Sequence, residues 1–215
     1  MAEPGLARAL LVALLVALLG PGARAYGTYE ERELVPAYGI KVGPYDNPSE
    51  AYSYFYLPFC KGEGVKADVQ DEHRKKTSLG IAFDGGRREL TGFRLPFAAD
   101  LGTEELCTVH PGPRDVRRLR EAVLNDWFYK LEVDGLPVVG FVGHVTTDDA
   151  ADGGALEDLA LGRAHREPEL VLYRHVTFEI HHNGPHVVEV IISTNSDTAI
   201  RVPSQGDVMD PFTYT

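Results

Sequence analysis

The sequence predicts a mainly β protein, an antiparallel β-sandwich with one amphipathic helix inserted. Apolar, β-prone runs flank the dipeptides Asp134-Gly135 and Asn183-Gly184, which supply the positive φ angles of hairpin turns. Between Arg114 and Phe128, apolar residues recur at the 3.6-residue spacing of a helix that buries one face. Many short strands with a single helix are typical of a sandwich with a helical insertion.

Residues 1–25 form a predicted signal peptide. The apolar run Ala9–Leu19 follows a short segment with one arginine and precedes Ala23-Arg24-Ala25, which has the form of a signal-peptidase site. This run is about half of the roughly 20 residues that a spanning helix needs, so cleavage before Tyr26 is expected over the alternative, a short uncleaved anchor. The mature chain, residues 26–215, is then expected to be one large domain, over the alternative of two small ones, and to be lumenal or secreted.

The mature chain is acidic. Removal of Glu3, Arg8 and Arg24 with the signal peptide changes the formal charge from −11 to −12. Binding to nucleic acid or to anionic lipid heads requires clustered lysine and arginine. The dense basic runs, residues 74–76 and 114–120, are interpreted as solvated surfaces, so no nucleic-acid partner is expected.

The segment Lys41–Cys60, KVGPYDNPSEAYSYFYLPFC, combines turn dipeptides with six aromatic rings. Gly43-Pro44 and Asn47-Pro48 are typical of turns. The aromatic run Tyr52–Leu57 that follows them predicts a strand.

Two further short strands are predicted at Leu79–Phe83 and Leu90–Leu95, on either side of the turn Asp84-Gly85-Gly86. The helix is predicted next, because a proline directly before Arg114 is typical of a helix start. It ends at Phe128 in this prediction. Its apolar positions are Val116, Leu119, Val123, Leu124 and Trp127.

The two hairpins are predicted over Asp126–Val145 and Val171–Ser193. In the first strand of the second hairpin, Val176, Phe178 and Ile180 alternate with polar residues, so one face of that strand is apolar and the other is exposed to solvent. Residues 146–168 are rich in Asp, Ala and Gly and predict a mobile acidic surface loop. Another strand is predicted to begin at Phe212, close to the last residue, which indicates a fragment of a longer protein.

The cysteines favour one disulfide. Cys60 and Cys107 are the two cysteines of the chain, and an even count in an oxidising compartment favours pairing. The alternative is a reactive thiol, which is disfavoured because neither cysteine lies in a CxxC redox motif.

A calcium site in the acidic loop is not expected. Asp148, Asp152 and Gly153 match positions 1, 5 and 6 of an EF-hand loop, but Ala150 and Leu159 stand at positions 3 and 12, where oxygen ligands are needed.

A zinc site in the second hairpin is also not expected. His175, His181, His182 and His186 lie there together with Glu179. Zinc requires tetrahedral convergence of its ligands, and this spacing contains neither a His-x-His nor a His-Glu-x-x-His arrangement. We therefore interpret the histidines as a solvated face and expect no cofactor.

Enzymatic activity is not expected either. The chain contains no G-x-S-x-G, G-x-x-x-x-G-K or G-x-G-x-x-G motif. Paired carboxylates carry little weight in a chain with 32 acidic residues.

The segment KVGPYDNPSEAYSYFYLPFC resembles the signature near the N-terminus of the nonaspanins, the transmembrane 9 superfamily. The similarity continues in order through HRKKTSLG, FDGGRREL and the Leu106-Cys107 pair. DGLPVVGFVGHV then resembles the family's D-x-L-P-x-W-G-F-[IV]-G motif, with Val139 in place of tryptophan, and YRHVTFEIHHNGPHVVEVIIS resembles its late lumenal hairpin. The motif residues, which we expect to be structural, are Val42, Gly43, Pro44, Tyr45, Asn47, Pro48, Tyr52, Leu57, Pro58, Phe59, Leu136, Pro137, Gly140, Phe141 and Gly143.

This resemblance implies the lumenal domain of a protein with nine membrane helices, which sorts and localises other membrane proteins in Golgi and endosomal membranes. Its partners would be membrane-protein clients, and it would contact the membrane only through helices absent from this chain. The match at both cysteine positions implies that Cys60 and Cys107 are bonded to each other.

Two other function classes stay open. The first is a secreted β-sandwich that binds a carbohydrate or protein ligand on its aromatic surface, and the second is a secreted hydrolase. Hydrophobic segments encoded after Thr215 would favour the lumenal domain of a membrane protein, whereas a stop codon there would favour the secreted ligand-binding protein.

We predict that folding requires no metal ion. A bound ion stabilises the folded state by mass action, so thermal melts with and without EDTA should superimpose. A melting temperature that drops by several degrees with the chelator would contradict this prediction.

Overall fold

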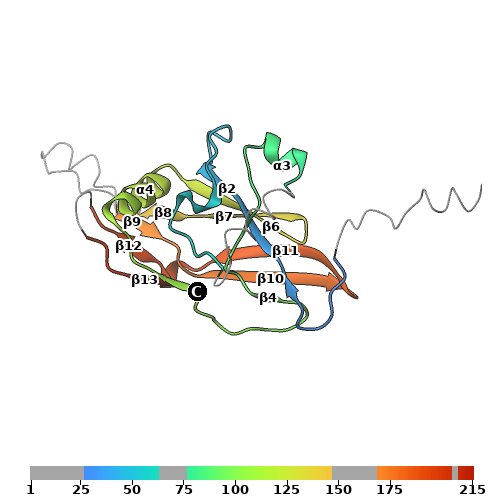
Figure 1. Cartoon of the computed structure of the whole chain (residues 1–215). Helices are drawn as coiled ribbons and strands as arrows, with labels where there is room; N and C mark the ends of the chain where they lie inside the picture. Colours follow the sequence, from blue (N-terminus) through green and yellow to red (C-terminus); the bar gives the residue numbers. More distant parts are fainter. Residues whose placement is uncertain (1–26, 63–76, 147–168, 205–207) are drawn as a thin grey trace, which may run out of the picture.

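The structure, a computed structural model, describes residues 27–62, 77–146, 169–204 and 208–215. The predicted signal peptide and residues 147–168 of the predicted acidic loop lie outside these ranges. The described chain is mainly β, and all its paired strands are antiparallel (Figure 1). Both features of the predicted fold class are confirmed.

The strands form several small sheets. Four strands make the largest sheet, in the order β3-β2-β6-β7, and smaller sheets have the orders β12-β9-β8, β10-β11, β1-β4 and β13-β5. The strands are β1 Leu34–Val35, β2 Ala37–Pro44, β3 Glu89–Leu90, β4 Leu95–Pro96, β5 Cys107–Val109, β6 Trp127–Val133, β7 Leu136–Phe141, β8 Gly143–Thr146, β9 Glu169–Leu172, β10 Val176–Asn183, β11 His186–Thr194, β12 Ile200–Val202 and β13 Phe212–Tyr214. The helices are α3 Leu79–Phe83 and α4 Pro113–Leu124, with 3-10 turns η1 Tyr54–Tyr56 and η3 Ser196–Thr198.

The four-stranded sheet and the β10–β11 hairpin lie in two layers, which gives a sandwich-like arrangement (Figure 1). A small core joins them, in which Val133 and Val138 of the sheet share a cluster with Val187 of the hairpin. Phe178 of β10 packs against this core and also against the main one, so it bridges the two.

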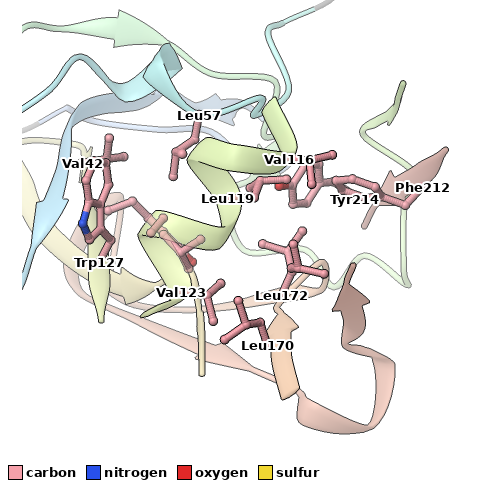
Figure 2. Packing of buried hydrophobic residues seen from close by; sticks show 14 of the residues in the cluster. Val42, Leu57, Val116, Leu119, Val123, Trp127, Leu170, Leu172, Phe212 and Tyr214 are labelled. Carbon is pink, nitrogen blue, oxygen red and sulfur yellow. The ribbon is translucent and has the colours of Figure 1, made fainter. Parts of the chain in front are cut away.

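The main core forms where α4 packs beside β6, β8 and β9. Val116, Leu119 and Val123 on the buried face of α4 share a cluster with Leu170 and Leu172 of β9 (Figure 2). This is the apolar face that the helical periodicity predicted, and it explains why a helix sits in a β protein.

Both predicted hairpins form. Asp134 and Gly135 have φ angles of 48° and 80°, the pair of positive values that a two-residue turn between twisted strands requires. In the second hairpin, Asn183 is still the last residue of β10, and the turn is made by Gly184, with a φ of 58°, and Pro185.

The predicted end of the helix is wrong. The helix stops at Leu124, where the Asn125 side chain donates to the Glu121 carbonyl, and Asp126 takes a left-handed φ of 47°. Trp127 begins β6 instead. Trp127 matched the helical spacing because its ring packs into the same core as the buried face of α4, although Trp127 belongs to the strand that follows the helix.

Two predicted strands are also wrong. Leu79–Phe83 is the short helix α3, because the Ser78 hydroxyl caps Ile81 and Gly85 ends the turn with a φ of 74°. In Tyr52–Leu57, Tyr52 alone makes a bridge, to Val42 of β2, before the chain turns through η1. The predicted strand Leu90–Leu95 is divided between the ends of β3 and β4.

Strand β2 was missed by sequence reasoning. Its sequence, AYGIKVGP, contains two glycines, a lysine and a proline, all of which weaken the strand signal. It lies between β3 and β6 and is buried on both faces. The glycine at position 39 is required because the ring of Tyr54 occupies the space that a side chain would need.

Replacing Leu119 by Ala should leave a cavity in the main core, because its side chain is fully buried. We expect a loss of about 2–5 kcal/mol in the free energy of unfolding, measured by urea denaturation. Leu124→Ala is the matched control on the same helix, since Leu124 is 46% exposed and should lose little. Equal losses for the two variants would contradict this packing of α4.

Candidate functional site

The two motif segments meet at one end of the four-stranded sheet. Pro44 of β2 pairs with Trp127 of β6, and Phe128 of β6 pairs with Phe141 of β7. The residues around Gly43-Pro44 and those around Gly140-Phe141 are therefore separated by only one strand. Sequence reasoning had noted both motifs but had not placed them together.

The inner face of this end is a stack of aromatic rings. The Tyr52 ring stacks on Trp127 with centroids 5.1 Å apart and on Tyr56 at 4.5 Å. The Arg118 guanidinium of α4 lies 4.1 Å from the centre of the Tyr56 ring and donates to the Tyr56 carbonyl. Offset stacking and the cation–π contact attach the aromatic segment to the helix.

The outer face of the same end carries three more rings. Tyr45 lies 5.6 Å from Phe141 and 6.5 Å from Phe128, measured between ring centroids. Tyr45 is 63% exposed and Phe141 is 41% exposed, and Val139 of β7 is exposed beside them. We call Tyr45, Phe128, Val139 and Phe141 the outer aromatic cluster. The cluster thus contains two exposed aromatic residues of the motif, Tyr45 and Phe141.

The two motif glycines at this end are required by close packing. A side chain at position 43 would collide with the carbonyl of Glu50, and one at position 140 would collide with the ring of Tyr129. These glycines hold the neighbouring loop and ring against the sheet, so their role is structural.

The other motif residues are mostly structural as well. Val42 and Leu57 are in the main core, and the ring of Phe59 contacts Tyr54, Tyr129 and Tyr214. The remaining positions lie at turns or strand ends: Asn47 donates to Glu50, Pro48 and Pro137 are exposed, Pro58 and Leu136 are half-buried, and Gly143 meets the Val171 carbonyl.

A buried lysine supports the outer face, and sequence reasoning missed it. Lys41 of β2 and Lys130 of β6 are directly opposite each other, and like charges in this position are destabilising. The Asp84 carboxylate lies between them, 2.8 Å from the Lys41 ammonium and 2.9 Å from the Lys130 ammonium. The Lys41 side chain is only 4% exposed, and its ammonium also donates to the Asp84 and Pro48 carbonyls. The sequence signal that could have revealed this buried charge is a single lysine among the apolar residues of β2.

The pKa of Asp84 reflects this arrangement. Partial desolvation acts to raise the pKa of this carboxyl, but hydrogen bonds from Lys41 and Lys130 outweigh it and leave the pKa below its usual value. The carboxylate is therefore ionised at neutral and mildly acidic pH.

The pKa values of Tyr52 and of three buried tyrosines beside it are raised. A hydrogen bond donated to Glu50, 2.7 Å long, raises the pKa of the Tyr52 hydroxyl to about 12. Burial raises the pKa of Tyr54, Tyr129 and Tyr214. A phenol with a raised pKa is a poor base at neutral pH, so the Tyr52 hydroxyl serves as a hydrogen-bond donor and the three buried tyrosines serve as packing groups.

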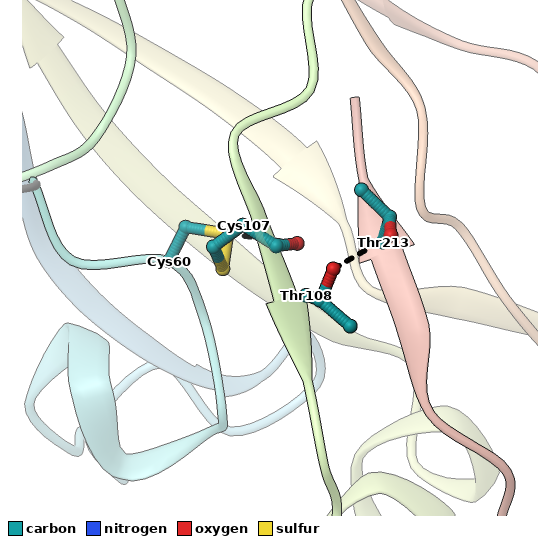
Figure 3. The surroundings of a disulfide bond; sticks show 4 residues. All are labelled: Cys60, Cys107, Thr108 and Thr213. Atoms are coloured by element: carbon teal, nitrogen blue, oxygen red, sulfur yellow. Dashed lines mark hydrogen bonds between the residues drawn. A yellow bond between two sulfur atoms is a disulfide. The ribbon is translucent and has the colours of Figure 1, made fainter.

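A disulfide joins Cys60 to Cys107, as the sequence predicts, with a Cα–Cα distance of 5.7 Å (Figure 3). Cys107 opens β5, which pairs with β13, and the hydroxyls of Thr108 and Thr213 are 3.0 Å apart across that pair. The bridge thus connects the end of the aromatic segment to the strand pair that contains the last residues of the chain.

The histidines of the second hairpin have different partners. His181 contacts Glu179 at 2.8 Å, His175 contacts the Thr215 hydroxyl at 2.9 Å, and His186 contacts the Gly27 carbonyl. In the described ranges, no three His, Cys, Asp or Glu side chains are grouped closely enough to hold a metal ion. The candidate calcium residues lie outside those ranges, so metal-independent folding stays a prediction.

Comparisons with known proteins agree with the resemblance that the motif indicates. Residues 51–215 match the family model described as endomembrane protein 70. The chain is similar to transmembrane 9 superfamily member 2 of Arabidopsis thaliana, with 33% identity over 87% of this chain and 28% of the relative. It is similar to transmembrane 9 superfamily member 1 of Pongo abelii, with 29% identity over 86% of this chain and 27% of the relative. No solved structure matches.

The chain therefore spans a little over a quarter of the length of these curated relatives. Across the described ranges, no helix has both the length and the apolar character needed to span a membrane.

Replacing Cys60 by Ser should lower the free energy of unfolding by about 2–4 kcal/mol, because the 47-residue separation is no longer closed in the unfolded chain. Urea denaturation measures the loss. The double variant Cys60→Ser/Cys107→Ser is the control that removes the surviving thiol and should lose a similar amount. Alkylation of both wild-type cysteines without reductant would refute the bridge.

Replacing Asp84 by Asn should destabilise the protein at pH 7 by about 1 kcal/mol, because two facing ammonium groups lose their shared carboxylate while solvent screens the 39% exposed side chain. A carboxyl with a lowered folded pKa stabilises the protein above its unfolded pKa, and that contribution is lost as the pH falls through the folded value. The difference between wild type and variant should therefore begin to shrink below about pH 4 and disappear at a lower pH still, where the carboxyl of the folded protein is protonated.

Urea midpoints of wild type and Asp84→Asn across this pH range measure the effect. Asp210→Asn is the control, because Asp210 is an exposed carboxyl away from this network. A destabilisation by Asp84→Asn that is unchanged in acid would contradict the charge-based account.

Proposed function

The chain belongs to the endomembrane protein 70 family of the transmembrane 9 superfamily, and we propose that it is a non-enzymatic lumenal domain that helps sort and localise other membrane proteins in the Golgi and endosomal system. The proposed partners are membrane-protein clients, which the domain contacts on its lumenal side. The observation that carries this proposal is the outer aromatic cluster.

The outer aromatic cluster has the composition of a protein-binding surface. Tyrosine and phenylalanine are enriched at interfaces, because a rigid ring buries a large area at a small cost in side-chain entropy. Phe128 and Phe141 are held by the paired strands β6 and β7, and Tyr45, the first residue after β2, packs its ring against both of them. The surface is thus formed before any partner arrives, which reduces the entropic cost of binding.

Charged side chains lie next to these rings. Lys130 lies on the same face and is paired with Asp84, and the Lys41 ammonium is 5.9 Å from the centre of the Phe128 ring. An apolar centre with a polar rim is the usual organisation of a specific interface.

Cells from which the gene for this protein is deleted provide the test. The full-length protein is re-expressed in these cells, and surface proteomics measures the membrane proteins at the cell surface. The wild-type protein should restore the surface levels of a set of membrane proteins. The variant Tyr45→Ser/Phe141→Ser should fail to restore them although it accumulates normally. Val208→Ser is the matched control, since Val208 is also an exposed apolar residue but is not one of the cluster residues.

Two results would overturn parts of the proposal. An unchanged surface proteome after deletion would reject the sorting role itself. Full rescue by Tyr45→Ser/Phe141→Ser, alongside a clear deletion phenotype, would reject the outer aromatic cluster as the surface that acts in it.

A further inference from the structure

Among the described residues, strand β10 is paired along one edge only, with β11, and its other edge lines a groove. The groove has a volume of about 670 Å³ and lies between β10 and the segment of residues 93–106. Its lining includes Asp100 and Glu104 of that segment, Glu179 of β10, and the rings of Phe93 and Phe178, which contact each other with centroids 4.8 Å apart. In Figure 1 the segment after β4 runs along the side of β10 that faces away from β11.

The backbone of β10 points hydrogen-bonding groups into this groove. The Val176 amide donates to the Thr215 carbonyl at 3.0 Å, not to β11, and the Thr215 amide donates to the Arg174 carbonyl at 2.9 Å. Residues of an antiparallel strand alternate between the two edges. The backbone N–H and C=O groups of Phe178 and Ile180 therefore also face away from β11.

These groups have no backbone partner in the described parts of the chain. Thr215 bonds across Arg174 and Val176 in the manner of a neighbouring strand, so the edge already accepts an extended backbone at its first position. A second strand laid beside Phe178, Ile180 and His182 would satisfy the remaining groups in the same way. At about 3.3 Å per residue, this length of edge suits a segment of about five or six residues.

The charged side chains along the groove determine which charge a bound segment should carry. Asp100, Glu104 and Glu179 line the groove with Arg94 as their cationic counterpart. The acidic excess favours lysine or arginine on the incoming strand, and the apolar ring of Phe178 favours apolar residues between them.

We propose that this groove binds an extended peptide segment with alternating apolar and basic residues, which adds to β10 as a further strand. Main-chain hydrogen bonds would supply affinity and the acidic rim would supply selectivity, which is how exposed sheet edges recognise peptides. The proposal rests on the geometry of β10 and is independent of the sorting role, because the outer aromatic cluster lies on the other layer.

The test uses the isotopically labelled protein, secreted from cells so that its disulfide forms, and a capped hexapeptide that alternates valine and lysine. At about 1 mM peptide, a level that detects weak binding, amide resonances of Phe178, Ile180 and residues 98–106 should shift. The same peptide N-methylated on the amides of one edge should bind at least about tenfold more weakly, because it cannot donate to the strand.

Two variants complete the test. Ile180→Pro removes one outward N–H and leaves the ladder to β11, since proline is tolerated on a free strand edge, and it should weaken binding about tenfold. Glu179→Lys should abolish the charge preference, because the two remaining acids are then balanced by Arg94 and the introduced ammonium, so that a valine–glutamate hexapeptide binds about as well as the valine–lysine one. If Ile180→Pro fails to fold, the N-methylated peptide and Glu179→Lys carry the test.

The absence of shifts at this peptide concentration, shifts that map to another surface, or equal binding of the N-methylated peptide would each overturn the proposal. An unchanged charge preference in Glu179→Lys would overturn its selectivity for basic segments.

Discussion

The inner face of strand β6 is the constraint on which the rest of the structure depends, because it belongs to both hydrophobic cores. Trp127, Tyr129 and Leu131 face the main core beneath α4, and Val133 on the same face closes the small core against the β10–β11 hairpin. Both edges of β6 are also paired, with β2 and with β7. A slip of one residue would turn this whole row to solvent, so the register of β6 is strongly determined.

The motif residues take their roles from this strand. Those that face inward, such as Val42 and Leu57, fill the core against it, and the motif glycines allow the Glu50 carbonyl and the Tyr129 ring to approach. Phe141 faces outward because alternate residues of a strand lie on opposite faces, and Tyr45, just after β2, packs its ring on the same outer side. One short sequence pattern thus builds both a packed interior and an exposed aromatic surface, with the Lys41–Asp84–Lys130 network supporting the outer side.

The two layers of the fold leave two separate surfaces. The outer aromatic cluster offers side chains on the four-stranded sheet, whereas β10 offers backbone groups along a groove on the hairpin layer. Side-chain surfaces of this kind recognise the shape of a folded partner, and strand edges recognise extended segments. The Cys60–Cys107 bridge lies between these regions and joins the aromatic segment to the β5–β13 pair, beside which Thr215 reaches the edge of β10.

By itself the sequence determined the features that depend on neighbouring residues. These are the mainly β class, the Asp134-Gly135 turn, the amphipathic face of α4 and the family motif, all of which are encoded by local periodicity or by residues with special backbone angles. The tertiary structure alone decided where elements with ambiguous patterns belong. Trp127 fits a helix or a strand until the core on each side is known, and AYGIKVGP becomes the central strand β2 because β3 and β6 supply its partners. The meeting of the two motifs, the placement of Asp84 between two opposed lysines and the edge of β10 along the groove likewise arise from contacts between residues far apart in the chain, which no local pattern records.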